Sequence, residues 1–159
     1  MKNKPYIQNK ATRSSRKELE EKVFRFFLDL GADFALIGTN YRFLGPNGQN
    51  YYPELVMFHI PSRRLVVFKI HKSTFRPTYL GKLNFYLTAA DEDLKKEGEN
   101  PSVGILLCEI TNEDTVRLAL KGYERPICVI DIQNLEESKK QISNFIETKL
   151  LPGKEVKEI

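Results

Sequence analysis

Two apolar runs joined by a short turn dominate the hydrophobic pattern of this chain. The first run reads YYPELVMFHI (51–60), the second reads LVVFKIH (65–71), and PSRR stands between them. Each run carries a charge where a half-buried strand is usually apolar: Glu54 in the first, and Lys69 with His71 in the second. Charged side chains are rarely buried without a partner. We therefore predict a hairpin in which Glu54 and Lys69 face each other, within about 8 Å.

The rest of the pattern predicts four helices and three further strands around this hairpin. Apolar residues recur at helical spacing in residues 15–31, 77–98, 111–120 and 135–151. Strands are predicted over 33–44, 102–110 and 127–132, the last two as nearly continuous apolar runs typical of strands buried on both faces. The order is α-β-β-β-α-β-α-β-α. It predicts an α/β fold in which a three-strand meander, followed by α-β-α-β, forms a central mixed sheet flanked by helices.

Charge is distributed unevenly along the 159 residues, which suffice for one domain. The first 17 residues contain no acid and six basic side chains: Lys2, Lys4, Lys10, Arg13, Arg16 and Lys17. Removing these six from the total of 25 leaves 19 basic against 21 acidic residues, a net charge of −2. We predict a basic disordered tail (1–14), a single domain (15–151) and a charged C-terminal tail (152–159). The basic tail either contacts nucleic-acid phosphates, through residues such as Lys10 and Arg13, or is simply a solvated leader.

Two features bear on the cellular compartment. No apolar run approaches the roughly 18 residues needed to span a bilayer, and the polar, basic N-terminus lacks the apolar core of a signal peptide. Cys108 and Cys128 both lie in apolar runs and show no metal-ligand spacing. We interpret them as buried, reduced thiols, with a disulfide as the alternative. The expected location is the cytoplasm, without membrane association.

Four segments resemble a known family: LDLGADFALIGTNYRF, YYPELVMFH, LVVFKIHKSTFRPTYLGKLNFYL and ENPSVGILLC. They are similar to the C-terminal domain of the YhcG-type family, within the PD-(D/E)XK nuclease superfamily. The distinctive part is TFRPTYLGKLNFYL followed by ENPSVGILLC, and the resemblance covers roughly Leu19 to Ile132. It implies the restriction-endonuclease-like fold, which agrees with the predicted order of elements.

The resemblance also implies roles for individual residues. The family pattern places an acid in the strand after the first turn, where Glu54 stands, and another acid late in the first helix, where Asp29 stands. Tyr86 matches a tyrosine of the helix that follows the third strand, and Lys82 stands where related nucleases often have glutamine. The third strand departs from the pattern, because it reads Lys69-Ile70-His71 in place of E-x-K.

This departure changes the predicted metal site. Mg²⁺ binds hard oxygen ligands, usually carboxylates together with water and phosphate. Lys69 replaces one such carboxylate with an ammonium group, so any site left to Glu54 and Asp29 is weak or lost. The simplest outcome is that the Lys69 ammonium occupies the place of the metal and pairs with Glu54, and with Asp29 if it is near. No cofactor is therefore expected, and Mg²⁺ would be required only if the site were active in a rearranged form. His71 could still orient a phosphate or move a proton.

Each candidate residue also has a structural interpretation. Glu54 and Lys69 can form a structural ion pair, and His71 can be a surface histidine at a strand end. Tyr86, with Tyr79, can pack in the core rather than stack on a base, and Asp29 can be a solvated helix-end residue. The nucleic-acid contacts suggested by Arg76, Lys82 and Tyr86 compete with a solvated helix face.

Three functional hypotheses follow. The first is a nuclease-fold domain with a degenerate site that binds nucleic acid, DNA in the first instance, without efficient cleavage. The second is an active Mg²⁺-dependent nuclease with a rearranged site. The third is a protein-interaction module, with a protein partner or a second copy, that retains only the fold. A basic cleft beside Glu54 and Lys82 would favour the first, and an exposed apolar patch would favour the third.

Overall fold

The structure is a computed structural model and describes residues 17–31, 33–45 and 48–151. Its central sheet has five strands in the order β1-β4-β5-β6-β7. The strands are β1 (Phe34–Thr39), β4 (Leu55–His59), β5 (Arg64–Thr74), β6 (Asn100–Glu109) and β7 (Ile127–Asp131). The first three form an antiparallel meander, while β6 and β7 run parallel to β5. The predicted mixed sheet of an α/β fold is confirmed.

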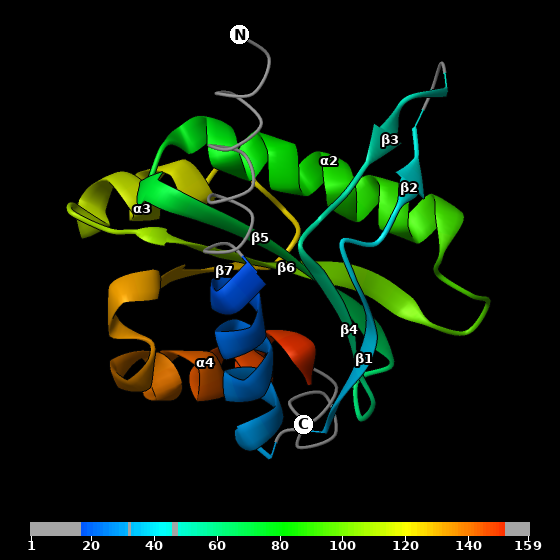
Figure 1. Ribbon diagram of the computed structural model, residues 1–159, viewed down its shortest axis with the longest axis horizontal. Helices are drawn as coiled ribbons and strands as arrows, with labels where there is room; N and C mark the ends of the chain where they lie inside the picture. The colour runs from blue at the N-terminus through cyan, green and yellow to red at the C-terminus, as the bar shows by residue number, and fades with distance from the viewer. Residues whose placement is uncertain (1–16, 32, 46–47, 152–159) are drawn as a thin grey trace, which may run out of the picture.

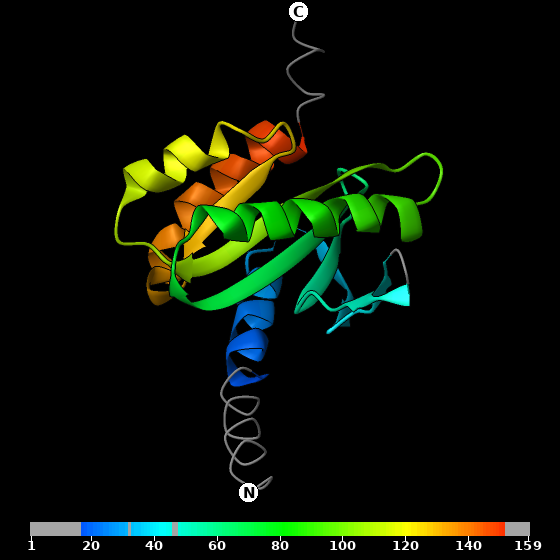
Figure 2. The same ribbon diagram turned by 90° about the horizontal axis from the view of Figure 1, so that it is seen from above.

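Helices cover both faces of this sheet (Figures 1 and 2). α2 (Pro77–Asp93) and α3 (Glu113–Leu120) pack on one face. Residues 17–29, here called the N-terminal helical segment, and α4 (Lys139–Phe145) pack on the other. The side chains of β5 alternate between the two faces of the sheet, which explains the two hydrophobic cores. Val66 and Phe68 point toward the N-terminal helical segment and α4, while the neighbouring positions point toward α2. Position 69 consequently faces α2.

The predicted strand over 33–44 is wrong in its extent. The chain leaves the sheet after β1 at Asn40, whose φ is +46°, a left-handed conformation that asparagine adopts more readily than most residues. It then forms β2 (Phe43–Leu44), which pairs with β3 (Asn50–Tyr51) in a separate two-stranded hairpin. This hairpin lies beside α2, and the Tyr51 and Phe85 rings meet with centroids 4.9 Å apart.

The C-terminal helix is also less regular than the pattern predicts. The chain makes 3-10 turns at Ile132–Asn134 and Glu136–Ser138, then α4, then a π-helical turn at Ile146–Leu150. Its apolar residues still pack against the sheet. Among the described residues, no helix is both long and apolar enough to cross a membrane. The predicted tails, 1–14 and 152–159, lie outside the described residues.

Candidate functional site

A buried ion pair joins the two central strands of the meander. Glu54 directly precedes β4, and the register that pairs Leu55 with Phe68 places Glu54 opposite Lys69. Lys69 Nζ lies 2.7 Å from Glu54 Oε2, and the backbone N–H of Ile70 donates to Glu54 Oε1 at 2.8 Å. Only 2% of Glu54 and 7% of Lys69 are exposed. The predicted meeting of Glu54 and Lys69 is confirmed, and both carboxylate oxygens have a protein donor.

Tyr86 covers this pair from α2. Its ring centroid lies 5.9 Å from Lys69 Nζ, and 4% of the residue is exposed. Burial, and then the negative charge of Glu54 and the neighbouring Tyr51, raise the pKa of the Tyr86 phenol, so the ring remains neutral. The structural interpretation of Tyr86 fits this burial, because a ring packed on both sides offers no face to a nucleic-acid base.

The next residue on the α2 side of β5 is His71, which stacks on Tyr79. The centroids of the two rings are 3.7 Å apart and their planes are nearly parallel, with an interplanar angle of 2°. The Tyr79 hydroxyl in turn lies 2.6 Å from Ser73 Oγ. His71 is therefore held by the first turn of α2, two residues beyond Lys69, and is partly buried rather than a free surface side chain.

α2 begins three residues after the end of β5, and its first turns carry the predicted basic contacts. Arg76, Tyr79 and Lys82 recur at intervals of three residues, which places neighbouring side chains on the same side of a helix. Arg76 and Lys82 are exposed, whereas Tyr79 turns toward His71. The two predicted basic contacts thus lie on the helix that carries Tyr79 and Tyr86, the residues that contact His71 and Lys69. The other two, Lys10 and Arg13, lie outside the described residues.

Asp29 is not brought to Glu54. It is exposed and lines a small cavity with Glu136, Lys139 and Ser143 beside α4. Glu20 is the acid of the same helical segment that turns inward, with 6% exposed. The two acids are nine residues apart, or about 13 Å along the helix. The sequence reasoning missed Glu20, although its spacing from Val23 and Phe27 places it on the buried stripe of the helix.

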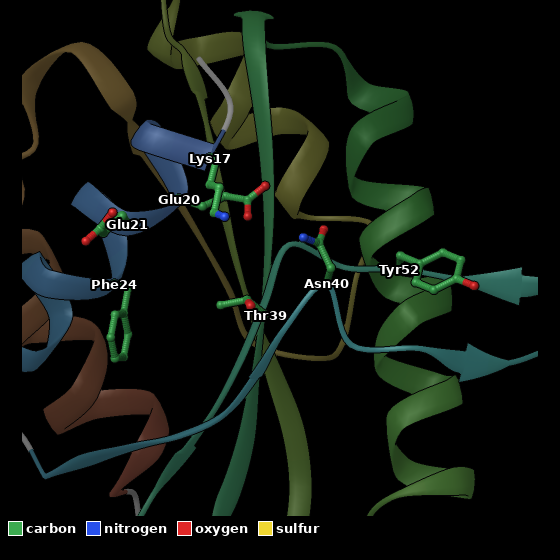
Figure 3. Close-up of a pocket in the computed structure, with 7 residues that line it drawn as sticks. All are labelled: Lys17, Glu20, Glu21, Phe24, Thr39, Asn40 and Tyr52. Atoms are coloured by element: carbon green, nitrogen blue, oxygen red, sulfur yellow. The ribbon is translucent and has the colours of Figure 1, made fainter. Parts of the chain in front are cut away.

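Glu20 lines a cavity of about 860 Å³, here called the helix–strand cavity. Figure 3 shows its walls, which come from the N-terminal helical segment, the end of β1 and the segment before Glu54. The lining residues are Lys17, Glu20, Glu21, Phe24, Thr39, Asn40 and Tyr52. The Asn40 N–H donates to the Glu54 carbonyl oxygen at 2.9 Å, so the cavity adjoins the ion pair along the backbone.

The side chains at Glu54 do not fit a divalent metal ion. Its two oxygens already accept from Lys69 and Ile70, and an ammonium stands where a further carboxylate would be needed. Among the described residues, no three histidine, cysteine, aspartate or glutamate side chains are grouped to hold a metal together. In this arrangement the Lys69 ammonium neutralises the Glu54 carboxylate, and two protein donors fix its position.

Comparison with known proteins places the chain in a family. The family model for the YhcG PDDEXK nuclease domain matches residues 6–147. The chain is also similar to the Escherichia coli (strain K12) protein named "Putative nuclease YhcG", with 27% identity over 124 residues. That match covers 77% of this chain and 33% of the relative, so the chain spans about a third of the length of that protein. Since the family model matches most of the sequence, the chain belongs to the YhcG PDDEXK nuclease domain family.

Proposed function

We propose that this domain binds nucleic acid, DNA in the first instance, through a nuclease fold whose Lys69 ammonium stands in place of a metal ion, and that it does not cleave its ligand efficiently. The observation that carries the proposal is the 2.7 Å contact between Lys69 Nζ and Glu54 Oε2 in a buried site. The charge that a metal would bring to the carboxylate is already supplied by the protein.

Electrostatics opposes entry of a metal at this position. Two like unit charges 4 Å apart repel by about 4 kcal/mol at an effective dielectric constant of 20. A divalent ion near the Lys69 ammonium would meet about twice that repulsion. It would also have to displace the ammonium from Glu54, whose second oxygen accepts from Ile70. Catalysis through Glu54 and a metal is therefore disfavoured in the sequence as it stands.

The basic side chains near the site support the nucleic-acid part of the proposal. Arg76 at the N-terminus of α2 and Lys82 within it are exposed, and the same helix carries Tyr79, on which His71 stacks. Cationic side chains along such a rim contact phosphates without reading sequence. Membership in a nuclease domain family points to the same class of ligand.

The proposal is tested by measuring DNA binding and DNA cleavage separately. Fluorescence anisotropy with labelled DNA should show salt-dependent binding, and plasmid DNA should remain supercoiled in Mg²⁺ or Mn²⁺. The pair Arg76→Ser and Lys82→Ser should weaken binding. The matched control is Arg117→Ser on α3 with Lys121→Ser directly after it, and this pair should change binding little. Metal-dependent nicking by the wild type would contradict the proposal, as would the absence of any DNA affinity.

A second prediction concerns the basic N-terminal residues. Deleting residues 1–14 removes Lys2, Lys4, Lys10 and Arg13 and no acid. If these charges neutralise phosphates of double-stranded DNA, each contributes about −0.9 to the slope of log K against log[salt]. The deletion should therefore weaken binding and flatten its salt dependence, as measured by anisotropy at several salt concentrations. Unchanged affinity and slope would assign the binding to the core surface alone.

A protein-interaction role is the second candidate, and one observation favours it. Three large apolar side chains are exposed: Leu44 (61%), Tyr52 (48%) and Phe85 (38%). Leu44 belongs to the β2–β3 hairpin, and Phe85 belongs to the α2 surface beside it. Exposed apolar groups of this kind mark docking surfaces when they are contiguous. The anisotropy measurement separates the two roles, because a domain that serves only as a docking module has no need of DNA affinity.

A further inference from the structure

We propose that the helix–strand cavity binds a single nucleobase, and that guanine is the base it fits best. This inference rests on the proposed function, because it names the part of the nucleic acid that the cavity would hold. The cavity volume of about 860 Å³ lies within the range typical of small-molecule sites and exceeds what one base requires. An unstacked base can enter such a pocket when the nucleic acid is single-stranded or when its duplex is locally opened.

The charges of the cavity exclude phosphate as the occupant of its interior. Glu20 and Glu21 contribute two carboxylates, against the single ammonium of Lys17. Glu20 is the buried member, with 6% exposed, whereas Lys17 and Glu21 are exposed at the rim. An anionic group inside the cavity would be repelled by the net negative charge of the lining side chains. A neutral ligand that presents N–H donors avoids this repulsion, while Lys17 at the rim is placed for the adjoining phosphate.

Guanine matches the buried carboxylate better than the other bases do. Its Watson–Crick edge presents two adjacent donors, N1–H and N2–H, which one carboxylate can accept together. Adenine and cytosine present a single amino donor beside an acceptor, and thymine presents one N–H between two acceptors. A carboxylate has about four acceptor positions, so Glu20 can accept from a ligand as well as from protein neighbours.

Asn40 supplies the complementary polar group and links the cavity to the ion pair. In Figure 3 the side chains of Glu20 and Asn40 point toward the same space, with Thr39 below them and Phe24 on the helical wall. An amide group can donate to the guanine O6 or N7 acceptors. The left-handed backbone of Asn40 is held by its N–H bond to the Glu54 carbonyl oxygen, which fixes where the side chain leaves the backbone at the cavity.

The experiment compares single-stranded oligonucleotides that differ at one central base. Fluorescein-labelled strands carry guanine, hypoxanthine (which lacks the N2 amino group) or thymine in an otherwise constant thymine sequence. The wild type should prefer guanine over hypoxanthine by about tenfold, a discrimination at the lower end for a paired-donor contact. Glu20→Gln should abolish this preference and leave the affinity for the all-thymine strand at or above that of the wild type.

Two further variants complete the experiment, the first as a control and the second as a test of the Asn40 contact. Glu21→Gln makes the same change of charge at an exposed carboxylate and should keep the preference. Asn40→Asp retains a residue that tolerates the left-handed backbone but removes the amide donor. Because guanine and hypoxanthine both carry the O6 and N7 acceptors, this change should weaken binding of both strands relative to the thymine strand and leave the preference for guanine over hypoxanthine. Thermal unfolding of each variant checks that the fold is intact, and a loss of preference counts only in a folded variant.

A titration with guanosine, which has no phosphate, tests the cavity apart from DNA binding. Millimolar guanosine should shift the amide NMR signals of Thr39 and Asn40 in the wild type and not in Glu20→Gln. If DNA is not bound at all, the proposed function fails, but these guanosine shifts would still support the cavity assignment. Equal affinity for the three strands, or a preference that survives Glu20→Gln, would overturn the inference, as would the absence of guanosine shifts.

Discussion

Replacing Glu54 with alanine should lower the free energy of unfolding by about 3–5 kcal/mol, the typical cost of breaking a buried ion pair from one side. The substitution leaves the Lys69 ammonium, 7% exposed, without its carboxylate and removes the acceptor of the Ile70 N–H. Equilibrium urea denaturation of wild type and variant measures the difference. The expected loss is a large fraction of the total stability of a domain of this size.

Two matched variants show whether the loss arises from the buried charge. The double change Glu54→Gln with Lys69→Met should recover most of the stability, because the amide oxygen still accepts from the Ile70 N–H and no buried charge remains. Asp114→Ala breaks the exposed pair that Asp114 forms with Arg117 at 3.3 Å, and should cost less than about 1 kcal/mol. A Glu54→Ala loss as small as that of Asp114→Ala would show that Lys69 reaches water instead of depending on Glu54.

The central sheet and the ion pair could both be predicted from the sequence, for the same physical reason. A strand alternates its side chains between two faces, so an isolated charge within an apolar run must find its partner on the neighbouring strand. The turn between the two runs fixes which residues are opposite, and this places Glu54 against Lys69. The parallel strands β6 and β7 were evident because strands buried on both faces are apolar throughout.

The acid of the first helix could not be chosen in this way. The helical segment carries acids at positions 18, 20, 21 and 29, and the family pattern alone favoured Asp29. Which acid turns inward depends on the rotation of the helix on the sheet, a property of packing. The inward stripe contains Val23 and Phe27, and this stripe includes Glu20 and leaves Asp29 exposed.

Two other features depend on contacts between different secondary-structure elements. The stack of His71 on Tyr79 requires β5 to continue beyond its pairing with β4, up to the first turn of α2. The departure of the chain at Asn40 requires the Glu54 carbonyl oxygen as an acceptor, 14 residues later in the sequence. Local pattern cannot reveal either contact, because each is set by the meeting of two segments.

Rebuilding the E-x-K triplet should create metal affinity that the wild type lacks. The double change Lys69→Glu with His71→Lys places a second carboxylate beside Glu54, whose present partner lies 2.7 Å away, and moves the ammonium two residues along β5. Two facing carboxylates repel each other without an ion and supply hard oxygen ligands with one. The variant should therefore be less stable than wild type in chelator and regain stability in Mn²⁺. Binding at 100 times the dissociation constant stabilises by about 2.7 kcal/mol.

Calorimetric titration with Mn²⁺, together with thermal unfolding in Mn²⁺ and in chelator, measures this gain. The control is Lys69→Gln with His71→Lys, which makes the same change at position 71 but supplies no second carboxylate, and should neither bind nor be stabilised. Equal Mn²⁺ binding by the control would show that the site does not depend on a carboxylate at position 69. Efficient metal-dependent DNA cleavage by the wild type, abolished by Glu54→Ala, would overturn the degenerate-site proposal. In that case the Lys69 ammonium would have to leave Glu54 during turnover, because its positive charge, 2.7 Å from Glu54 Oε2, repels an ion at that carboxylate.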